Sequence, residues 1–297
     1  MNKIGFIGLG IMGKPMALHL VKGGFDVMVS DLNEKVVAEV CGAGAAAGTY
    51  EDLAKNCDII LMILPTGAIV HSVLFGEGGL ARHLTSGKVV CDMSSVTPGE
   101  SQTCYNKLKE IGVGFVDAPV SGGEPGAVAG TLAIMCGGDE ADFKRLEPAF
   151  RAMGSSALLI GGPGAGSVTK LANQIMVNLN IAAVSEALTL AAKAGVNPYK
   201  VFQAVRGGLA GSTVLNDKAP MMCARNFKPG GTIRVNHKDI KNALSTAHEI
   251  DVPLPLTAQL FEIQQALKVA GHMDDDHAGY VQFYEQLAGV IVQGGEE

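Results

Sequence analysis

"KIGFIGLGIMGKPM" (residues 3–16) joins a short apolar run to three glycines spaced as G-x-G-x-x-G, and a helical pattern follows at once. In such a strand–turn–helix unit, Gly8 permits the tight turn and Gly10 lets a pyrophosphate approach the backbone. Gly13 lets the helix pack closely on the strand, and the free N–H groups at the helix start attract phosphate. The stretch therefore predicts the first βα unit of a dinucleotide-binding sheet.

The next apolar run, "FDVMVSD" (25–31), ends in Asp31, which lies 18 residues after Gly13. An acidic residue at that place accepts hydrogen bonds from the ribose hydroxyls of NAD. Leu32 and Asn33 follow, so no arginine stands there to bind the 2′-phosphate of NADP. We therefore expect NAD as the cofactor, with NADP as the alternative. The competing interpretation is an ordinary glycine turn that Asp31 caps.

Short apolar runs alternate with amphipathic segments over the first 160 residues. This alternation predicts βαβ units, hence a Rossmann-like, doubly wound and mostly parallel sheet with helices on both faces. The expected strands are Lys3–Ile7, Val27–Ser30, Ile59–Leu64, Val89–Asp92, Gly114–Val116, Leu132–Met135 and Leu158–Ile160, and helices are expected between most of them, for example Pro98–Ile111 and Glu140–Met153.

The strand pattern stops after Gly166, and only helical patterns follow. We place a domain boundary at "GGPGAG" (161–166), which gives an α/β domain over 1–163 and an all-α domain over 164–297. A long helix joins the two. The expected helices are 167–194, 198–206, 213–224, 236–250, 255–270 and 276–292.

Composition excludes several classes of protein. The chain is 47% hydrophobic and 18% charged, which excludes disorder, and its net charge of −6 makes it a poor nucleic-acid binder. Six scattered cysteines without a C-x-x-C pair are typical of reduced thiols in the cytoplasm, and the N-terminus has no leader pattern. We therefore expect a cytoplasmic protein.

The apolar stretch 175–194 approaches the length of a membrane span. It carries Asn178, Asn180, Glu186 and Lys193, however, and charge within a bilayer is costly. A core helix is therefore expected, and no membrane contact. A helix so apolar needs cover on most sides, which could come from the later helices or from a second subunit, and we expect a homodimer or homotetramer.

A second glycine cluster, "DAPVSGGEPGAVAG" (117–130), follows a predicted strand. It should therefore lie at the carboxyl edge of the sheet, where doubly wound folds bind their ligands. Ser121, Gly122 and Gly123 can present successive N–H groups and a hydroxyl to a carboxylate. The alternative interpretation is a simple turn.

Lys170 and Asn173 lie one turn apart near the start of the long helix, in "GSVTKLANQ" (166–174). Hydride transfer to a carbonyl leaves an alkoxide, and a positioned ammonium can protonate it. Asn173 can orient the lysine or bind a substrate hydroxyl. The alternative is a lysine whose head simply reaches solvent at a helix end. The glycines of "GGPGAGSV" (161–168) resemble a P-loop, but Ser167 stands where that motif requires lysine.

Five motifs in order, "GFIGLGIMGKPM", "DMSSVTP" (92–98), "DAPVSGGEPGAVAGTL", "GAGSVTKLANQ" and "HKDI" (237–240), resemble the β-hydroxyacid dehydrogenase family. That family includes 3-hydroxyisobutyrate dehydrogenase and tartronate semialdehyde reductase. The resemblance spans essentially the whole chain. It implies a Rossmann domain, an all-α domain, a nicotinamide cofactor and a small carboxylate-bearing substrate.

Site residues carry over by position. The resemblance implies Lys170 and Asn173 as catalytic residues, and Ser121, Gly122, Gly123, Lys170, Asn173 and Asp239 as substrate-binding residues. The implied cofactor-binding residues are Gly8, Gly10, Ile11, Met12, Gly13, Asp31, Leu64, Pro65, Thr97 and Lys238.

Within the family, "SEALTLAAKAGVNP" (185–198), "RGGLAGSTVL" (206–215) and "KAPMMCARNFKPG" (218–230) most resemble tartronate semialdehyde reductases. We therefore expect reduction of tartronate semialdehyde (2-hydroxy-3-oxopropionate) to D-glycerate with NAD(P)H. A 3-hydroxyisobutyrate or 2-(hydroxymethyl)glutarate dehydrogenase is the nearest alternative. A non-catalytic nucleotide-binding scaffold or redox sensor is the alternative of another class.

The segment "GHMDDDHAGY" (271–280) superficially resembles a metal site. We interpret it instead as a solvated turn with a helix cap, and the other histidines show no ligand spacing, so no metal is expected.

Overall fold

The structure is a computed structural model and describes residues 3–295. The described chain divides into two units, one ending at Lys170 and the other beginning at Leu171. Helix α8 (Ala165–Lys193) begins in the first unit and continues through the second.

The first unit is built on a sheet of nine strands within residues 3–295, in the order β3-β2-β1-β4-β5-β6-β8-β7, with β9 paired to β8. Neighbours from β3 to β6 are parallel, and β8 is antiparallel to β6 and β7. The strands are β1 (Lys3–Ile7), β2 (Asp26–Ser30), β3 (Ala46–Ala47), β4 (Ile59–Met62), β5 (Val89–Asp92), β6 (Gly114–Asp117), β7 (Val120–Ser121), β8 (Leu132–Gly138) and β9 (Gly154–Gly161).

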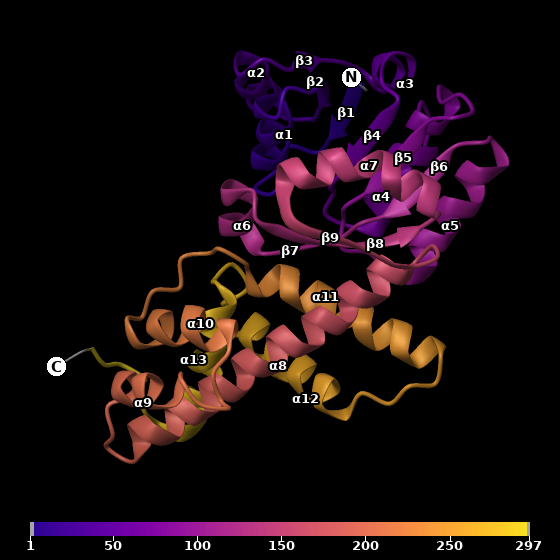
Figure 1. Ribbon diagram of the computed structural model, residues 1–297. Coiled ribbons are helices and arrows are strands. Elements are labelled where there is room, and N and C mark those ends of the chain that lie inside the picture. The colour runs from indigo at the N-terminus through magenta and orange to yellow at the C-terminus, as the bar shows by residue number, and fades with distance from the viewer. Residues whose placement is uncertain (1–2, 296–297) are drawn as a thin grey trace. The chain divides into compact units, whose positions relative to one another are not determined.

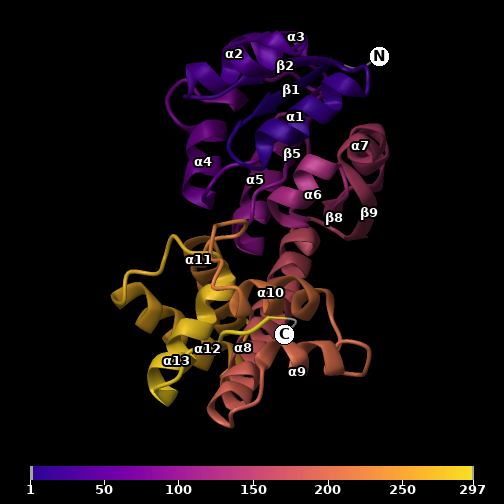
Figure 2. The same ribbon diagram turned by 90° about the vertical axis from the view of Figure 1, so that its left-hand side faces the viewer.

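Helices cover both faces of this sheet (Figures 1 and 2). Successive residues of a strand point to opposite faces, so in β4 Ile59 and Leu61 enter one apolar core and Ile60 and Met62 enter the other. The helices are α1 (Gly13–Lys22), α2 (Glu34–Gly42), α3 (Tyr50–Asn56), α4 (Gly67–Phe75), η1 (Leu80–Arg82), α5 (Pro98–Glu110), α6 (Gly123–Ala129) and α7 (Glu140–Met153).

The second unit is helical and packs around α8. Its own apolar core includes Ile181 and Leu188 of α8. The other elements are α9 (Pro198–Val205), α10 (Thr213–Cys223), α11 (Ile233–Glu249), α12 (Pro255–Val269), η2 (His277–Tyr280) and α13 (Val281–Ala288).

Helix α8 is long and apolar enough to cross a membrane by length and composition, and 44% of its most apolar window is buried. Its polar residues are used inside the unit: Asn178 is buried and accepts a hydrogen bond from the Tyr280 hydroxyl at 2.7 Å. Ser185 is also buried and bonds to the Ile181 carbonyl. This pattern is that of a core helix.

The predicted fold class, a mostly parallel doubly wound sheet followed by an all-α part, is confirmed. The strand predictions missed β3 and β7, which have two residues each and leave no periodicity to detect. The predicted helix 276–292 was wrong in its extent. A 3₁₀ turn opens that segment, and α13 ends at Ala288 before Gly289, whose left-handed conformation closes the helix.

Candidate active site

The three glycines of the first turn have distinct physical surroundings. Gly8 has φ +93°, a conformation that a residue with a side chain rarely adopts. A Cβ on Gly13 would overlap the carbonyl oxygen of Gly8, so α1 can start this close to β1 only without a side chain there. A Cβ on Gly10 would meet no atom within 4 Å. The space beside Gly10 is therefore open, which fits the approach of a pyrophosphate.

Asp31 follows the carboxyl end of β2 and holds the glycine turn. Its Oδ2 accepts a hydrogen bond from the Leu9 N–H at 2.5 Å, and its Oδ1 accepts one from Asn33 N–H at 2.8 Å. A carboxylate has about four acceptor positions, so these two bonds leave it able to accept from ribose hydroxyls. Asp31 thus fixes the turn and remains chemically suited to the role predicted for it.

A cavity of about 650 Å³ lies beside this turn. Gly10, Ile11 and Asp31 contribute to its wall, together with Lys14 and Lys22 of α1. The residues present therefore fit a dinucleotide: the wall combines open backbone, a carboxylate and positive side chains. Lys14 is engaged with Glu39 of α2, however, and the wall contains no arginine.

The other predicted cofactor residues of the first unit follow β4 and β5. The Leu64 N–H donates to Ser94 Oγ at 2.8 Å, which ties the two loops together. Pro65 is exposed beside Leu64. Thr97 is the N-cap of α5, where its hydroxyl accepts from the Glu100 N–H and donates to the Glu100 carboxylate. A contact from Thr97 to a cofactor would thus come from a residue already fixed by a capping box.

Lys170 reaches the second glycine cluster. Its Nζ donates to the Val120 carbonyl oxygen at 2.8 Å, and Val120 directly precedes Ser121. Gly122 and Gly123 follow with φ of +132° and +59°, so the chain turns sharply there with its backbone groups presented in succession. The first unit thus brings together two predicted features that lie about 50 residues apart in sequence, the lysine and the turn.

Asn173 and the predicted residues of α11 belong to a polar group in the second unit, in which Gln174, Asn236 and Asp239 are buried. Asn173 Nδ2 donates to Gln174 Oε1 at 3.0 Å, and Gln174 Nε2 donates to Asp239 Oδ2 at 2.7 Å and to Asn236 Oδ1 at 3.3 Å. Lys238 Nζ lies 3.2 Å from Asp239 Oδ1. Asp239 is only 1% exposed. Its carboxylate is therefore enclosed and bonded to protein.

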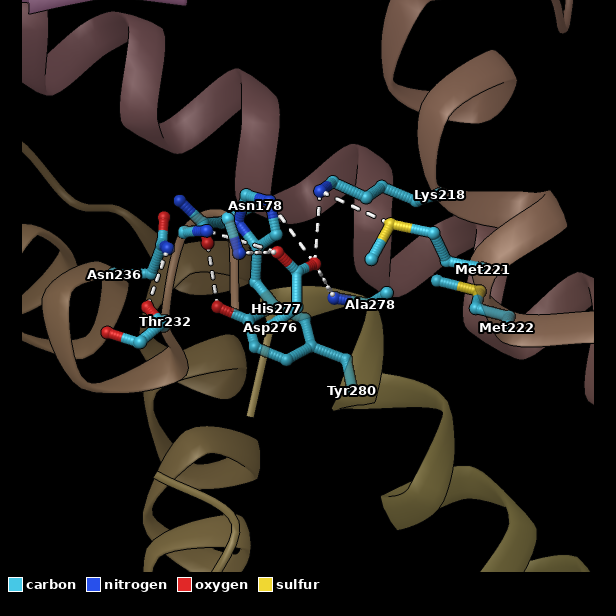
Figure 3. A network of polar contacts seen from close by, with 12 residues as sticks. Asn178, Lys218, Met221, Met222, Thr232, Asn236, Asp276, His277, Ala278 and Tyr280 are labelled. Carbon is cyan, nitrogen blue, oxygen red and sulfur yellow. Dashed lines mark hydrogen bonds and ion pairs between the residues drawn. The ribbon is translucent and has the colours of Figure 1, made fainter. Parts of the chain in front are cut away.

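The acidic segment near the C-terminus is a turn whose residues differ in exposure. Asp274 is 82% exposed and Asp276 caps η2 through the Ala278 N–H, as expected for a solvated turn with a helix cap, but the Asp276 side chain itself is fully buried. Its carboxylate also accepts from Lys218 Nζ and from the Gly230 and Gly231 N–H groups (Figure 3). Within residues 3–295, no cluster of three or more histidine, cysteine or acidic side chains has the geometry to hold a metal ion.

Several polar residues that sequence reasoning left without a role are buried here. Asp92 and Asp117 are paired residues at the ends of β5 and β6, and each is 1% exposed. Gln174 and Asn236 join α8 to α11. The sequence did hold a signal for Asp92 and Asp117, because each comes at the end of an apolar strand run. An acid in such a place is rarely buried without a hydrogen-bond or charge partner, so both could have been predicted to have one.

Comparisons with known proteins agree with this architecture. Residues 3–162 match the family described as the NAD-binding domain of 6-phosphogluconate dehydrogenase. Residues 164–284 match the family described as NAD-binding of NADP-dependent 3-hydroxyisobutyrate dehydrogenase.

Among similar sequences, the 2-hydroxy-3-oxopropionate reductase of Escherichia coli is 43% identical and aligns over 96% of this chain and 98% of its own. The 2-(hydroxymethyl)glutarate dehydrogenase of Eubacterium barkeri is 38% identical over 99% and 98%. Among solved structures, 3-hydroxyisobutyrate dehydrogenase of Mycobacterium tuberculosis with L-serine superposes with a TM-score of 0.88 at 28% identity, covering 95% of this chain and 98% of that one.

Proposed function

Because this chain belongs to the NAD(P)-dependent β-hydroxyacid dehydrogenases, we propose that it reduces tartronate semialdehyde to D-glycerate. The bond from Lys170 Nζ to the Val120 carbonyl carries the mechanistic part of the proposal. It places an ammonium next to the Ser121–Gly123 turn, in the unit that also holds the cofactor turn. The substrate is proposed from the 43% identity to the E. coli reductase.

Lys170 acts in this proposal as the proton donor. Bound NADH or NADPH supplies the hydride that reduces the aldehyde carbon. The aldehyde oxygen gains negative charge as this happens, and an ammonium beside it both stabilises that charge and delivers a proton. The Val120 carbonyl orients the ammonium by accepting one of its three hydrogens.

Ser121, Gly122 and Gly123 hold the substrate carboxylate in this proposal. Their backbone turn can direct N–H groups at an anion, and the Ser121 hydroxyl adds a further donor. Asn173 binds the substrate hydroxyl or orients Lys170 from one helical turn away. Fixing the carboxylate and the hydroxyl orients the aldehyde for hydride transfer. Such positioning of reacting groups can lower the activation barrier by a large amount.

For the cofactor we propose a preference for NAD(H), with Gly8, Gly10, Ile11, Met12 and Gly13 at the pyrophosphate and Asp31 at the adenosine ribose. A 2′-phosphate would be repelled by the Asp31 carboxylate. Leu64, Pro65 and Thr97 lie on the loops after β4 and β5 and complete the cofactor site in this proposal. Lys238 also contacts the cofactor, and Asp239 acts by holding Lys238 and Gln174.

Four of the buried cysteines do not favour a redox sensor that works through their thiols. Burial raises the pKa of Cys57 and Cys223 to about 11 and that of Cys104 and Cys136 to about 12. Thiols with such pKa values carry little thiolate at neutral pH, and the thiolate is the reactive form.

The test is the loss of NADH absorbance with tartronate semialdehyde as substrate, for the unmodified protein and for Lys170→Ala. We expect kcat to fall roughly 10²- to 10⁴-fold in the variant, because a general acid contributes about that much. Lys193→Ala is the matched control. Lys193 lies on the same helix and also donates to a backbone carbonyl at 2.8 Å, that of Ala288, so its removal should leave kcat unchanged.

Other outcomes point elsewhere. Faster reduction by NADH of methylmalonate semialdehyde, the aldehyde that corresponds to 3-hydroxyisobutyrate, or of the aldehyde that corresponds to 2-(hydroxymethyl)glutarate, would replace the proposed substrate with another of the family. A kcat/KM at least equal with NADPH would overturn the cofactor preference. NADH binding without turnover of any of these compounds would favour the scaffold.

A further inference from the structure

Helix α8 cannot cap its own N-terminus. The residue before it, Gly164, has no side chain and adopts φ +90°, so it offers no side-chain oxygen to the first N–H groups of the helix. Those groups need acceptors when they are buried, since four of them lack a partner within a helix. The cap comes instead from Asp117, about 50 residues earlier in the chain.

Asp117 binds the start of α8 with both carboxylate oxygens. Oδ1 accepts from the Gly164 N–H at 2.8 Å and Oδ2 accepts from the Ser167 N–H at 2.7 Å. Burial raises the pKa of Asp117, while these two backbone hydrogen bonds lower it, and negative charge at a helix N-terminus is favourable. A third tie joins the hydroxyls of Ser167 and Ser101 of α5 at 2.9 Å.

Two glycines let the helix come close enough for these bonds. A Cβ on Gly137 of β8 would lie 2.6 Å from the Gly166 nitrogen and 2.7 Å from the Ala165 nitrogen. A Cβ on Gly166 would overlap the carbonyl oxygen of Met135 in β8. The first turn of α8 therefore rests backbone to backbone on the sheet, and its height and rotation are fixed there.

The same short segment holds both the helix and the lysine. Asp117 ends β6 and accepts a hydrogen bond from the Ser167 N–H. Val120, three residues later, begins β7 and accepts a hydrogen bond from Lys170. Lys170 in turn lies three residues after Ser167. The segment then continues into Ser121–Gly123. We infer that Asp117 is a positioning residue for the reaction, because it sets where the Lys170 ammonium stands relative to the Ser121–Gly123 turn.

This inference rests on the role proposed for Lys170, and the test separates the two. In Asp117→Asn one carboxylate oxygen is replaced by an NH₂ group, which cannot accept the hydrogen bond of a backbone N–H. The start of α8 should therefore shift relative to the end of β6. We expect kcat to fall roughly 10- to 100-fold, as small misplacements of catalytic groups do, with the Kd for NADH within about twofold of the unmodified protein. In Asp117→Asn/Lys170→Ala, kcat should be no lower than in Lys170→Ala alone, because a residue that acts only through the lysine has no effect without it.

A second readout needs no turnover. Labelling of Lys170 with an amine-reactive reagent, followed by mass spectrometry with Lys193 as the internal standard, should be faster in Asp117→Asn. The matched control is Asp142→Asn on α7, a partly buried carboxylate of the same unit without a bond to α8. If Asp117→Asn fails to fold, Ser167→Ala removes the hydroxyl that bonds to Ser101 and to the Asp117 side chain but keeps the backbone bonds of Asp117, and it should show a smaller change of the same kind.

Unchanged labelling together with unchanged kcat in a folded Asp117→Asn would overturn the inference. The inference would also be overturned if the fold-loss of kcat in the double variant equalled the product of the two single losses, since Asp117 would then act independently of Lys170. Retained activity in Lys170→Ala would instead overturn the proposed role of the lysine, and the labelling rates would still decide whether Asp117 positions it.

Discussion

Asp92 is a buried acid whose ionisation opposes folding. It ends β5, is 1% exposed, and accepts a hydrogen bond at Oδ1 from the Ser94 N–H at 2.9 Å. Within residues 3–295, Oδ2 has no hydrogen-bond partner. Burial, together with the negative charges of Asp117 and Glu100, raises the pKa of Asp92 to about 6 against the opposing bonds of Ser94. An unfolded aspartate titrates near pH 4, so the folded chain keeps this proton to a higher pH than the unfolded chain does.

The contribution of Asp92 to folding stability should therefore fall with rising pH through a defined window. Between about pH 4 and pH 6 the unfolded chain releases the Asp92 proton while the folded chain keeps it, so this residue's contribution is lost as pH rises through the folded pKa. In Asp92→Asn that loss is absent. The free energy of unfolding of the variant, relative to that of the unmodified chain, should rise by about 2 kcal/mol from pH 4 to pH 7.

Urea unfolding at several pH values measures this difference. Repeating it at high salt is the control, because a buried carboxyl is screened far less than surface charges. Parallel stability curves for the two proteins would show that Asp92 does not titrate as its burial requires.

At the scale of elements, the β1–α1 turn separates two uses of glycine that look identical in sequence. Gly13 is required by packing, because any side chain there would overlap the Gly8 carbonyl oxygen. Gly10 faces open space, so the fold itself tolerates a side chain at that position. The need for glycine at position 10 therefore comes from the bound pyrophosphate in the proposed function.

Alanine at each position should separate these uses. Gly10→Ala should keep the melting temperature of the unmodified protein and weaken NADH binding, because its methyl group occupies the space beside the phosphates. Gly13→Ala should lower the melting temperature, since α1 must move away from β1. Thermal unfolding and NADH titration of both variants measure this. Equal melting temperatures, or normal NADH binding by Gly10→Ala, would contradict the assignment.

At the scale of the whole molecule, one buried carboxylate in the helical unit connects α10, the loop before α11 and η2. The Asp276 carboxylate accepts a hydrogen bond from Lys218 Nζ of α10 at 3.0 Å (Figure 3). It also accepts from the Gly230 and Gly231 N–H groups before α11 and from the Ala278 N–H of η2. Burial alone would raise the pKa of Asp276, but the positive charges of His277 and Lys218 and the Ala278 N–H lower it. Segments far apart in the chain thus meet at a single ionised group.

Removing this group should destabilise the helical unit strongly. Asp276→Ala leaves the Lys218 ammonium, which is only 16% exposed, without its carboxylate partner, and we expect a loss of roughly 3–5 kcal/mol in the free energy of unfolding. Asp274→Ala, two residues away, is the matched control. Asp274 is 82% exposed and pairs with Arg234, so its loss should cost about 0–1 kcal/mol. Chemical denaturation of the two variants tests this, and losses of equal size would contradict it.

Much of the fold was predictable because its signals are local. The bounds of β1, β5 and α7 follow from apolar periodicity, and the start of α5 follows from a proline and a threonine cap. The two-residue strands β3 and β7 were not predictable, since they exist only through pairing with β2 and β8. The 3₁₀ start of the segment 276–292 was missed, because its pattern does not show that the Asp276 side chain bonds to α10 and to the loop before α11.

For the candidate site, the sequence determined the kinds of residue and their order: a glycine turn with an acid after the second strand, a serine–glycine turn, and a lysine near the start of a long helix. Local spacing suffices for these, because each motif acts within one turn or one strand–helix unit. Only the tertiary structure decided that Lys170 reaches Val120, that Asp239 is enclosed, and that Asp117 caps α8. Such contacts join residues about 50 or more positions apart, and the burial that makes them strong exists only once the chain has folded.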